Sequence, residues 1–218
     1  MTVLVREQFG IEKSSRYIGK IMSTLGVKSS FRKPWRKRED KTLNQLVNNI
    51  ANRDFKNDNI YSADVKYISN VNLHGNFVYI EPILNWGSKF IVAWDIDFAQ
   101  GISQTMRNLK NANMPENSIF HTDRGSQYCS GLITEFLNEN KITKSLSRKA
   151  NCWDNRESEY FFSILQSECL DFIKTNAMNI DEIKATIANF IHHYNYERRQ
   201  KQLNWLTPYQ YMVQSRVA

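Results

Sequence analysis

Residues 118–162 read SIFHTDRGSQYCSGLITEFLNENKITKSLSRKANCWDNRESEYFF, and this stretch decides the fold class. Two short segments, Ser118–Thr122 and Ile142–Leu146, are expected to be strands. A segment with helical periodicity follows each of them, Ser130–Asn138 after the first run and Trp153–Asp171 after the second. Because strands that alternate with helices are typical of parallel additions to a sheet, these residues predict an α/β fold.

Strand signals also precede this stretch, and helical signals surround it. Three β-rich runs separated by short turns predict a meander, and Leu43–Phe55 predicts a short helix or turn leading into it. This order of elements is that of the RNase H-like fold, a mixed five-stranded sheet flanked by helices, and it places the core at residues 43–218. The expected strands are Tyr61–Ile68, Asn76–Leu84 and Lys89–Asp97, and the further helices are Ile102–Ala112 and Ile180–Tyr194.

The first part of the chain has a different character. Helical periodicity is present at residues 2–9 and 14–25, and a basic stretch containing Pro34 follows at 28–41. We therefore expect a first region, residues 1–42, made of a helical stub and a basic linker; the family resemblance described below implies that the stub is a partial helix-turn-helix remnant.

The charge of the chain is concentrated at this end. The 218-residue chain carries a net charge of +7, but its first 38 residues hold ten Lys or Arg and two Glu, a net +8. The rest of the chain holds 19 basic and 20 acidic residues, a net −1. A basic arm on a near-neutral body predicts contact with a polyanion, although a solvated tail has the same composition. The arm residues expected to contact nucleic acid are Arg32, Lys33, Arg36, Lys37 and Arg38.

Composition excludes several other classes of protein. Three cysteines (Cys129, Cys152 and Cys169) are too few for a disulfide framework, which favours a reducing compartment. No apolar run reaches the length that spans a membrane, and the N-terminus lacks the pattern of a secretory signal. We expect a cytoplasmic protein without a membrane partner. Zinc binding is not expected, because the spacing of Cys152, Cys169, His192 and His193 matches no common zinc site.

The positions of three acids relative to the predicted strands and helices indicate a shared site. Asp64 lies within the first predicted strand, Asp123 follows the fourth, and Glu159 is on the helix that begins near Trp153. A carboxylate in a strand is unfavourable unless a cation neutralises it. Mg²⁺ and Mn²⁺ prefer such hard oxygen ligands, and two ions can activate a hydroxyl and stabilise a leaving oxygen in phosphodiester chemistry.

Other acids compete for these roles. Asp95 and Asp97 are alternatives to Asp64, and Asp123 has the simpler alternative of capping its own loop. Glu157 and Glu168 are alternatives to Glu159, although Glu157 would point about 200° away from Glu159 around the helix. Asp154 is expected to be the N-cap of this helix, and Asn155 to contact DNA from the face of Glu159.

Basic residues in the loop before this helix are candidates for phosphate contact, with a solvated loop as the alternative. His121, two residues before Asp123, either orders the metal site or is a core histidine. The predicted nucleic-acid-binding residues of this part are Lys144, Arg148, Lys149 and Asn155.

These motifs, in order, resemble a known family. HTDRGSQYCS (121–130), NCWDN (151–155), YNYERRQKQLN (194–204) and TPYQY (207–211) are similar to the transposases of bacterial insertion sequences made by frameshifting between two reading frames. The chain resembles the second-frame product, OrfB, which carries a DDE integrase catalytic core like that of retroviral integrases. The likeness covers residues 14–212 and includes the family's 35-residue gap between its second and third acids.

The resemblance implies an activity and its residues. Asp64, Asp123 and Glu159 would be the catalytic, metal-binding acids, holding two Mg²⁺ or Mn²⁺ ions for nicking and strand transfer at transposon ends. Transposon and target DNA, further copies of the chain and the first-frame product, OrfA, would be the partners, in the bacterial cytoplasm at the nucleoid. Alternatives are a weakly active DNA-binding or dimerising fragment and an RNase H-like nuclease.

This chain departs from the family pattern at several positions. Tyr61 and Ala63 stand where the family has Trp and Thr before its first Asp, and Gln166 and Ser167 stand where a DNA-facing Lys is usual. Those last replacements predict weaker phosphate contact without an effect on metal binding. The family's helix-turn-helix region is expected to be only partly present.

Overall fold

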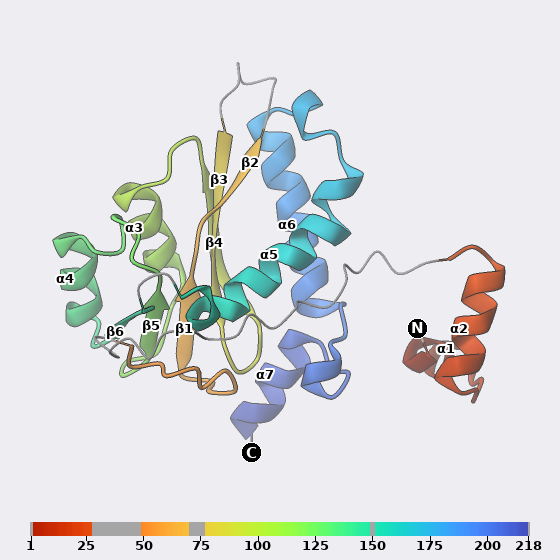
Figure 1. Cartoon of the computed structure of the whole chain (residues 1–218). Coiled ribbons are helices and arrows are strands. Elements are labelled where there is room, and N and C mark those ends of the chain that lie inside the picture. The colour runs from red at the N-terminus through yellow and green to blue at the C-terminus, as the bar shows by residue number, and fades with distance from the viewer. Residues whose placement is uncertain (1, 28–48, 70–76, 149–150, 218) are drawn as a thin grey trace. The chain divides into compact units, whose positions relative to one another are not determined.

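The computed structural model describes residues 2–27, 49–69, 77–148 and 151–217. The chain forms two compact units, Met1–Pro34 and Trp35–Ala218, which are described separately (Figure 1). The predicted boundary at residues 42/43 and the basic linker lie outside the described residues, as do Arg32, Lys33, Arg36, Lys37, Arg38 and Lys149.

The first unit contains the two predicted helices, α1 (Thr2–Phe9) and α2 (Ser15–Thr24). Ser14 caps α2, since its side chain accepts the backbone N–H of Tyr17 at 3.3 Å. Gly26 follows the end of α2 with a φ of +70°, a left-handed conformation that glycine adopts without strain. Both helix predictions are confirmed.

A mixed sheet forms the centre of the second unit. One edge of β3 pairs antiparallel with β4, and its other edge pairs antiparallel with both β1 and β2. β1 then continues the sheet in parallel to β5, and β5 in parallel to β6. The strands are β1 (Ile60–Ala63), β2 (Lys66–Ser69), β3 (Phe77–Asn85), β4 (Ile91–Asp97), β5 (Ile119–Thr122) and β6 (Thr143–Leu146).

The predicted five-stranded sheet is corrected in one respect, because its first strand is divided at Asp64 and Val65 into β1 and β2. The described residues therefore form a six-stranded sheet. Oδ1 of Asp64 accepts the backbone N–H of Val65 at 2.8 Å, a local bond that competes with the ladder of the sheet. The break leaves Asp64 at the end of β1 rather than within a strand.

Helices cover both faces of this sheet (Figure 1). α3 (Ile102–Asn111) and α4 (Gly131–Glu139) pack on one face around Phe120, Leu109 and Leu137. α5 (Arg156–Glu168) and α6 (Ile180–Tyr196) pack on the other face, where Ile80 and Ile96 of the sheet meet Phe161, Ile187 and Tyr194 of the helices. The predicted RNase H-like architecture is confirmed.

Two details of the helices differ from expectation. α5 begins three residues later than predicted and ends at Glu168 rather than Asp171, because 3₁₀ turns at Cys152–Asn155 and Leu170–Phe172 flank it. A last helix, α7 (Pro208–Val217), was not predicted. Thr207 and Gln210 exchange hydrogen bonds of 3.0 and 3.1 Å across its first turn, a capping box with proline at the first helical position. No helix among the described residues has the length and apolarity to cross a membrane.

Candidate active site

Asp64 and Asp123 lie at the same edge of the sheet. β1 and β5 are adjacent and parallel, with Ser62 opposite His121, and each acid follows two residues after its member of that pair. The carboxyl ends of adjacent parallel strands meet at one edge, where open α/β sheets bind their ligands. The two acids are thereby brought together by strand register.

Backbone amides orient each of these carboxylates through one oxygen. Asp64 accepts the N–H of Val65, and Oδ1 of Asp123 accepts the N–H of Gly125 at 2.8 Å. A Cβ at position 125 would meet the same oxygen at 3.0 Å and the Gln127 side chain at 2.9 Å, so glycine gives the loop room to close on the acid.

Glu159 lies in the first turn of α5. α5 is held against β1 by a hydrogen bond of 2.9 Å between the buried hydroxyls of Ser62 and Ser158, next to Glu159. Asn155 adds two bonds at the start of the helix: its amide donates to the carbonyl of Ala63 at 3.4 Å, and its Oδ1 accepts from Ser158 at 3.1 Å. The strand of Asp64 and the helix of Glu159 are therefore directly connected.

The three acids repel one another. The pKa of Asp64 is raised to about 7, first by burial, then by the charge of Asp123 and, less, by that of Glu159; bonds from Val65 and Asn155 oppose the shift. Within the described residues, no three His, Cys, Asp or Glu side chains lie close enough together to hold a metal ion in the positions that they occupy here. The carboxylates form an open group of hard oxygen donors whose repulsion a divalent cation would relieve, and this donor set fits Mg²⁺ or Mn²⁺.

The competing acids are engaged elsewhere. Asp95 and Asp97 pair with Arg107 at 2.7 and 2.5 Å. Glu168, at the far end of α5, receives two bonds of 2.7 Å from Arg198. Glu157 is buried and binds Lys89 at 3.0 Å and Arg156 at 2.5 Å.

The prediction that Asp154 caps α5 was wrong. Asp154 lies inside the 3₁₀ turn, and the N-cap is Asn155, whose side chain makes no capping bond. The carboxylate of Asp154 is fully buried and binds Arg53 at 2.7 Å and Arg148 at 2.6 Å. These bonds hold its pKa below the usual range despite burial, which acts in the opposite direction.

The residues of this region that are predicted to contact DNA make contacts within the protein, and these contacts differ from one residue to the next. Asn155 is buried and bound to the strand, and the Arg148 guanidinium binds Asp154. Lys144 is half-buried and donates to Thr134 at 2.8 Å. Arg124, which sequence reasoning missed, is exposed beside Asp123, and its Nε donates to the Ser147 carbonyl at 2.9 Å.

His121 is a core histidine. Its ring nitrogens lie 2.9 Å from the hydroxyls of Ser145 and Ser147, its ring packs edge-on against Trp86, and burial lowers its pKa to about 4.

Sequence reasoning also missed a buried carboxyl, that of Glu81 in β3. It accepts hydrogen bonds from Tyr128 at 2.7 Å and Thr105 at 2.8 Å, and burial raises its pKa. An acid in the middle of a strand is the signal that singled out Asp64, and it applies equally to Glu81.

Comparison with known proteins shows what the chain is similar to. Models described as "Integrase core domain" match residues 56–152 and 140–208. The putative transposase InsK of insertion sequence element IS150 from Escherichia coli K12 is 27% identical over 211 residues, which are 94% of this chain and 74% of that protein. An uncharacterized transposase-like protein from Haemophilus influenzae is 29% identical over 218 residues, 99% of both chains.

Solved structures show the same fold. The catalytic core domain of HTLV-2 integrase, determined in complex with magnesium, superposes with a TM-score of 0.53 at 15% identity, covering 70% of this chain and 95% of that one. The RNase H-like topology is therefore shared at a level where few residues are the same.

Proposed function

The chain belongs to the bacterial insertion-sequence transposases with an integrase core, and from that premise we propose that Asp64, Asp123 and Glu159 are its catalytic acids. Their reaction is phosphodiester nicking and strand transfer at transposon ends. The observation that carries the proposal is the meeting of Asp64 and Asp123 at adjacent parallel strand ends, with Glu159 on a helix bonded to one of those strands. Coulomb coupling of Asp64 to both other acids supports it.

The acids have the chemistry to hold divalent metal, and we propose two Mg²⁺ or Mn²⁺ ions. The HTLV-2 integrase core, similar in fold, was determined with magnesium. When bound, such ions activate an oxygen nucleophile and stabilise the leaving oxygen of an in-line displacement. Val65 and Gly125 fix the carboxylates of Asp64 and Asp123 before any ion arrives, which reduces the reorganisation that binding requires.

DNA contact is assigned to basic residues around this site and in the arm. Arg124, next to Asp123 in the sequence, and Lys144 of β6 are positively charged, and we propose that they contact phosphates. The arm residues Arg32, Lys33, Arg36, Lys37 and Arg38, together with Lys149, stay predicted phosphate contacts, and binding of this kind weakens steeply with salt. Transposon and target DNA, further copies of the chain and the first-frame product OrfA are the proposed partners, in the bacterial cytoplasm at the nucleoid.

A strand-transfer assay tests this function. Purified chain, with Mg²⁺ or Mn²⁺ and a labelled duplex carrying the end of the element, is expected to join a 3′-OH end to target DNA. Asp123→Asn is expected to abolish joining while DNA binding persists, because the amide loses the charge that attracts the ion. Salt-sensitive DNA binding without nicking at any metal concentration would support the fragment alternative, and cleavage of RNA in a hybrid without joining would support the nuclease.

A further inference from the structure

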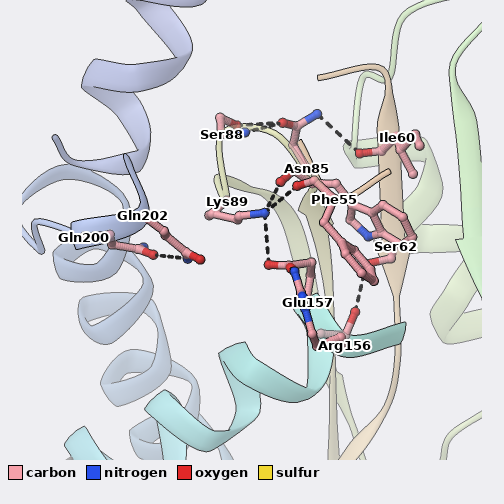
Figure 2. Close-up of polar contacts among 12 residues, drawn as sticks. Phe55, Ile60, Ser62, Asn85, Ser88, Lys89, Arg156, Glu157, Gln200 and Gln202 are labelled. Carbon is pink, nitrogen blue, oxygen red and sulfur yellow. Dashed lines mark hydrogen bonds and ion pairs between the residues drawn. The ribbon is translucent and has the colours of Figure 1, made fainter. Parts of the chain in front are cut away.

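A buried ion pair joins the turn between β3 and β4 to the first turn of α5. Nζ of Lys89 lies 3.0 Å from Oε2 of Glu157, and their side chains are only 7% and 3% exposed. Lys89 also donates to the carbonyls of Phe55, at 2.7 Å, and Trp86 (Figure 2). Because an ammonium has three donors, these partners use all of them.

The second oxygen of Glu157 is also bound. Oε1 accepts from Nε and Nη2 of Arg156 at 3.1 and 2.5 Å. The Arg156 guanidinium in turn lies over the ring of Phe55, 3.8 Å from its centroid. Phe55, Lys89, Arg156 and Glu157 thus form one group, which we call the helix-start clamp (Figure 2).

The clamp adds a buried ion pair to the hydrogen bonds that Ser158 and Asn155 make with β1 at the start of α5. The first four N–H groups of a helix have no partner within it, and the α5 N-cap, Asn155, makes no side-chain capping bond. Glu157 is a favourable charge at this end of the helix dipole. Removal of one partner from a buried pair leaves an uncompensated charge, so Lys89 holds the Glu157 side of the first turn. The bonds of Ser158 and Asn155 hold its side toward β1.

Glu159 is two residues after Glu157 on the same turn, about 200° around the helix axis. When the buried side of that turn is fixed at Lys89, the opposite side, which carries Glu159, is fixed as well. Outer residues that orient a metal ligand typically contribute about 10- to 100-fold to metal affinity or activity.

We propose that Lys89 is a positioning residue for the transposase reaction, acting through Glu157 to set the place of Glu159. The inference rests on the proposed function of Glu159 and deepens it. Glu157, which competes with Glu159 in the sequence, acquires a separate role as the link between the turn and the helix.

A matched pair of variants of the full chain tests this role. Lys89→Met removes the charge at the start of α5, and Arg198→Met removes the partner of Glu168 at its other end. The first measurement is the Mn²⁺ concentration at which half of the rise in unfolding midpoint is reached. The second is the hydrogen exchange of amides 156–160 in the absence of metal. The third is the strand-transfer rate together with the KM for DNA.

Lys89→Met is expected to raise the half-saturating Mn²⁺ concentration and lower the strand-transfer rate by about 10- to 100-fold, with KM for DNA unchanged. Amides 156–160 should exchange faster. Arg198→Met should melt earlier but match the wild type in Mn²⁺ half-saturation and rate. Equal Mn²⁺ half-saturation and equal exchange at the helix start in both variants would overturn the proposal.

Two further variants keep the outcome interpretable. If Lys89→Met does not fold, Glu157→Gln decides, since it keeps the shape and removes the charge; a smaller shift in the same direction is expected, and no shift overturns the proposal. If the wild type joins no DNA, the proposed function fails by itself. Mn²⁺ stabilisation that is lost in Asp123→Asn and weakened in Lys89→Met would still support the positioning role.

Discussion

The guanidinium of Arg148 makes a two-point contact with the carboxylate of Asp154. Nε donates to Oδ2 at 2.8 Å and Nη2 to Oδ1 at 2.6 Å, while the backbone N–H of Arg148 donates to Oδ2 at 2.9 Å. Asp154 is completely buried, so these bonds compensate a charge that has no access to water. The loop before α5 is therefore bound to the 3₁₀ turn that precedes this helix.

Arg148→Met is expected to lower the free energy of unfolding by about 2 kcal/mol, because a buried carboxylate loses charge-assisted hydrogen bonds while Arg53 keeps part of the compensation. Urea denaturation of the metal-free protein measures this. Lys144→Met is the control, since its hydrogen bond to Thr134 is partly exposed and its loss should change stability little. The structural role would be contradicted if Arg148→Met were as stable as the wild type. Phosphate contact would be favoured if the slope of log binding constant against log salt concentration for DNA binding fell by about 1 in the same variant.

The burial of His121 predicts a dependence of stability on pH. Its pKa falls from 6.5 to about 4 on folding, so the unfolded chain takes up a proton at a pH where the folded protein does not. The contribution of His121 to stability is full above the unfolded pKa and decreases by about 1.4 kcal/mol for each pH unit below it, until the folded pKa is reached.

His121→Gln should remove this slope, and the difference between variant and wild type isolates it from other titrating groups. Unfolding free energies at several pH values between 4 and 7 provide the comparison. Parallel pH curves for the wild type and His121→Gln would show that the histidine is already charged in the fold.

The buried carboxyl of Glu81 predicts the opposite dependence. Burial raises its pKa, so the stability that it contributes is greatest at low pH and is lost as the pH rises through the folded pKa. Glu81→Gln keeps an acceptor for Tyr128 and Thr105 and cannot ionise, so its stability relative to the wild type should increase between pH 5 and pH 8.

Glu81→Leu is the matched contrast. It leaves the hydroxyls of Tyr128 and Thr105 without their acceptor in the core, and each unsatisfied group costs about 1–3 kcal/mol. The amide of Asn108 keeps the backbone carbonyl of residue 81 as its acceptor, at 2.6 Å. Thermal unfolding at both pH values separates the two effects. A Glu81→Gln variant that loses stability equally at both would mean that the carboxyl is ionised throughout.

The fold was predictable because its signals are local. Alternating strands and helices in residues 118–162, with a meander before them, gave the RNase H-like order, and both N-terminal helices were found from their periodicity. The division of the first strand was missed because it depends on one bond from Val65 to Asp64. α7 was missed although Thr207, Pro208 and Gln210 carry a recognisable capping signal.

The candidate site was predictable only as far as sequence position determines it. Asp64 and Asp123 follow parallel strands, so register alone brings them together. The partners of Arg148 and Lys89 were not predictable, because the acids that they bind become neighbours only after the sheet and α5 have packed. Spacing shows which residues share an element, whereas such ion pairs depend on how two elements meet.

Removal of the charge of Asp64 should raise the stability of the metal-free protein and abolish its activity. At pH 8 the carboxyl is ionised against burial and two neighbouring acids, because its pKa is raised to about 7, above the unfolded value of 3.8. Its contribution to stability is therefore lost as the pH rises through 7. Asp64→Asn keeps an acceptor for the N–H of Val65 and removes the charge, so the metal-free variant should gain about 2–4 kcal/mol at pH 8. It should lose strand transfer.

Bound metal should make the wild type more stable than Asp64→Asn. The wild type should gain stability when Mg²⁺ or Mn²⁺ binds the folded state, so its unfolding midpoint should rise with ion concentration. Asp64→Asn should show much less of this rise, whereas Asp95→Asn, whose partner is Arg107 outside the site, should retain it. Chelation with EDTA should return the wild type to its lower midpoint and leave Asp64→Asn almost unchanged. A wild type that is already more stable than Asp64→Asn at pH 8 without metal would contradict the repulsion.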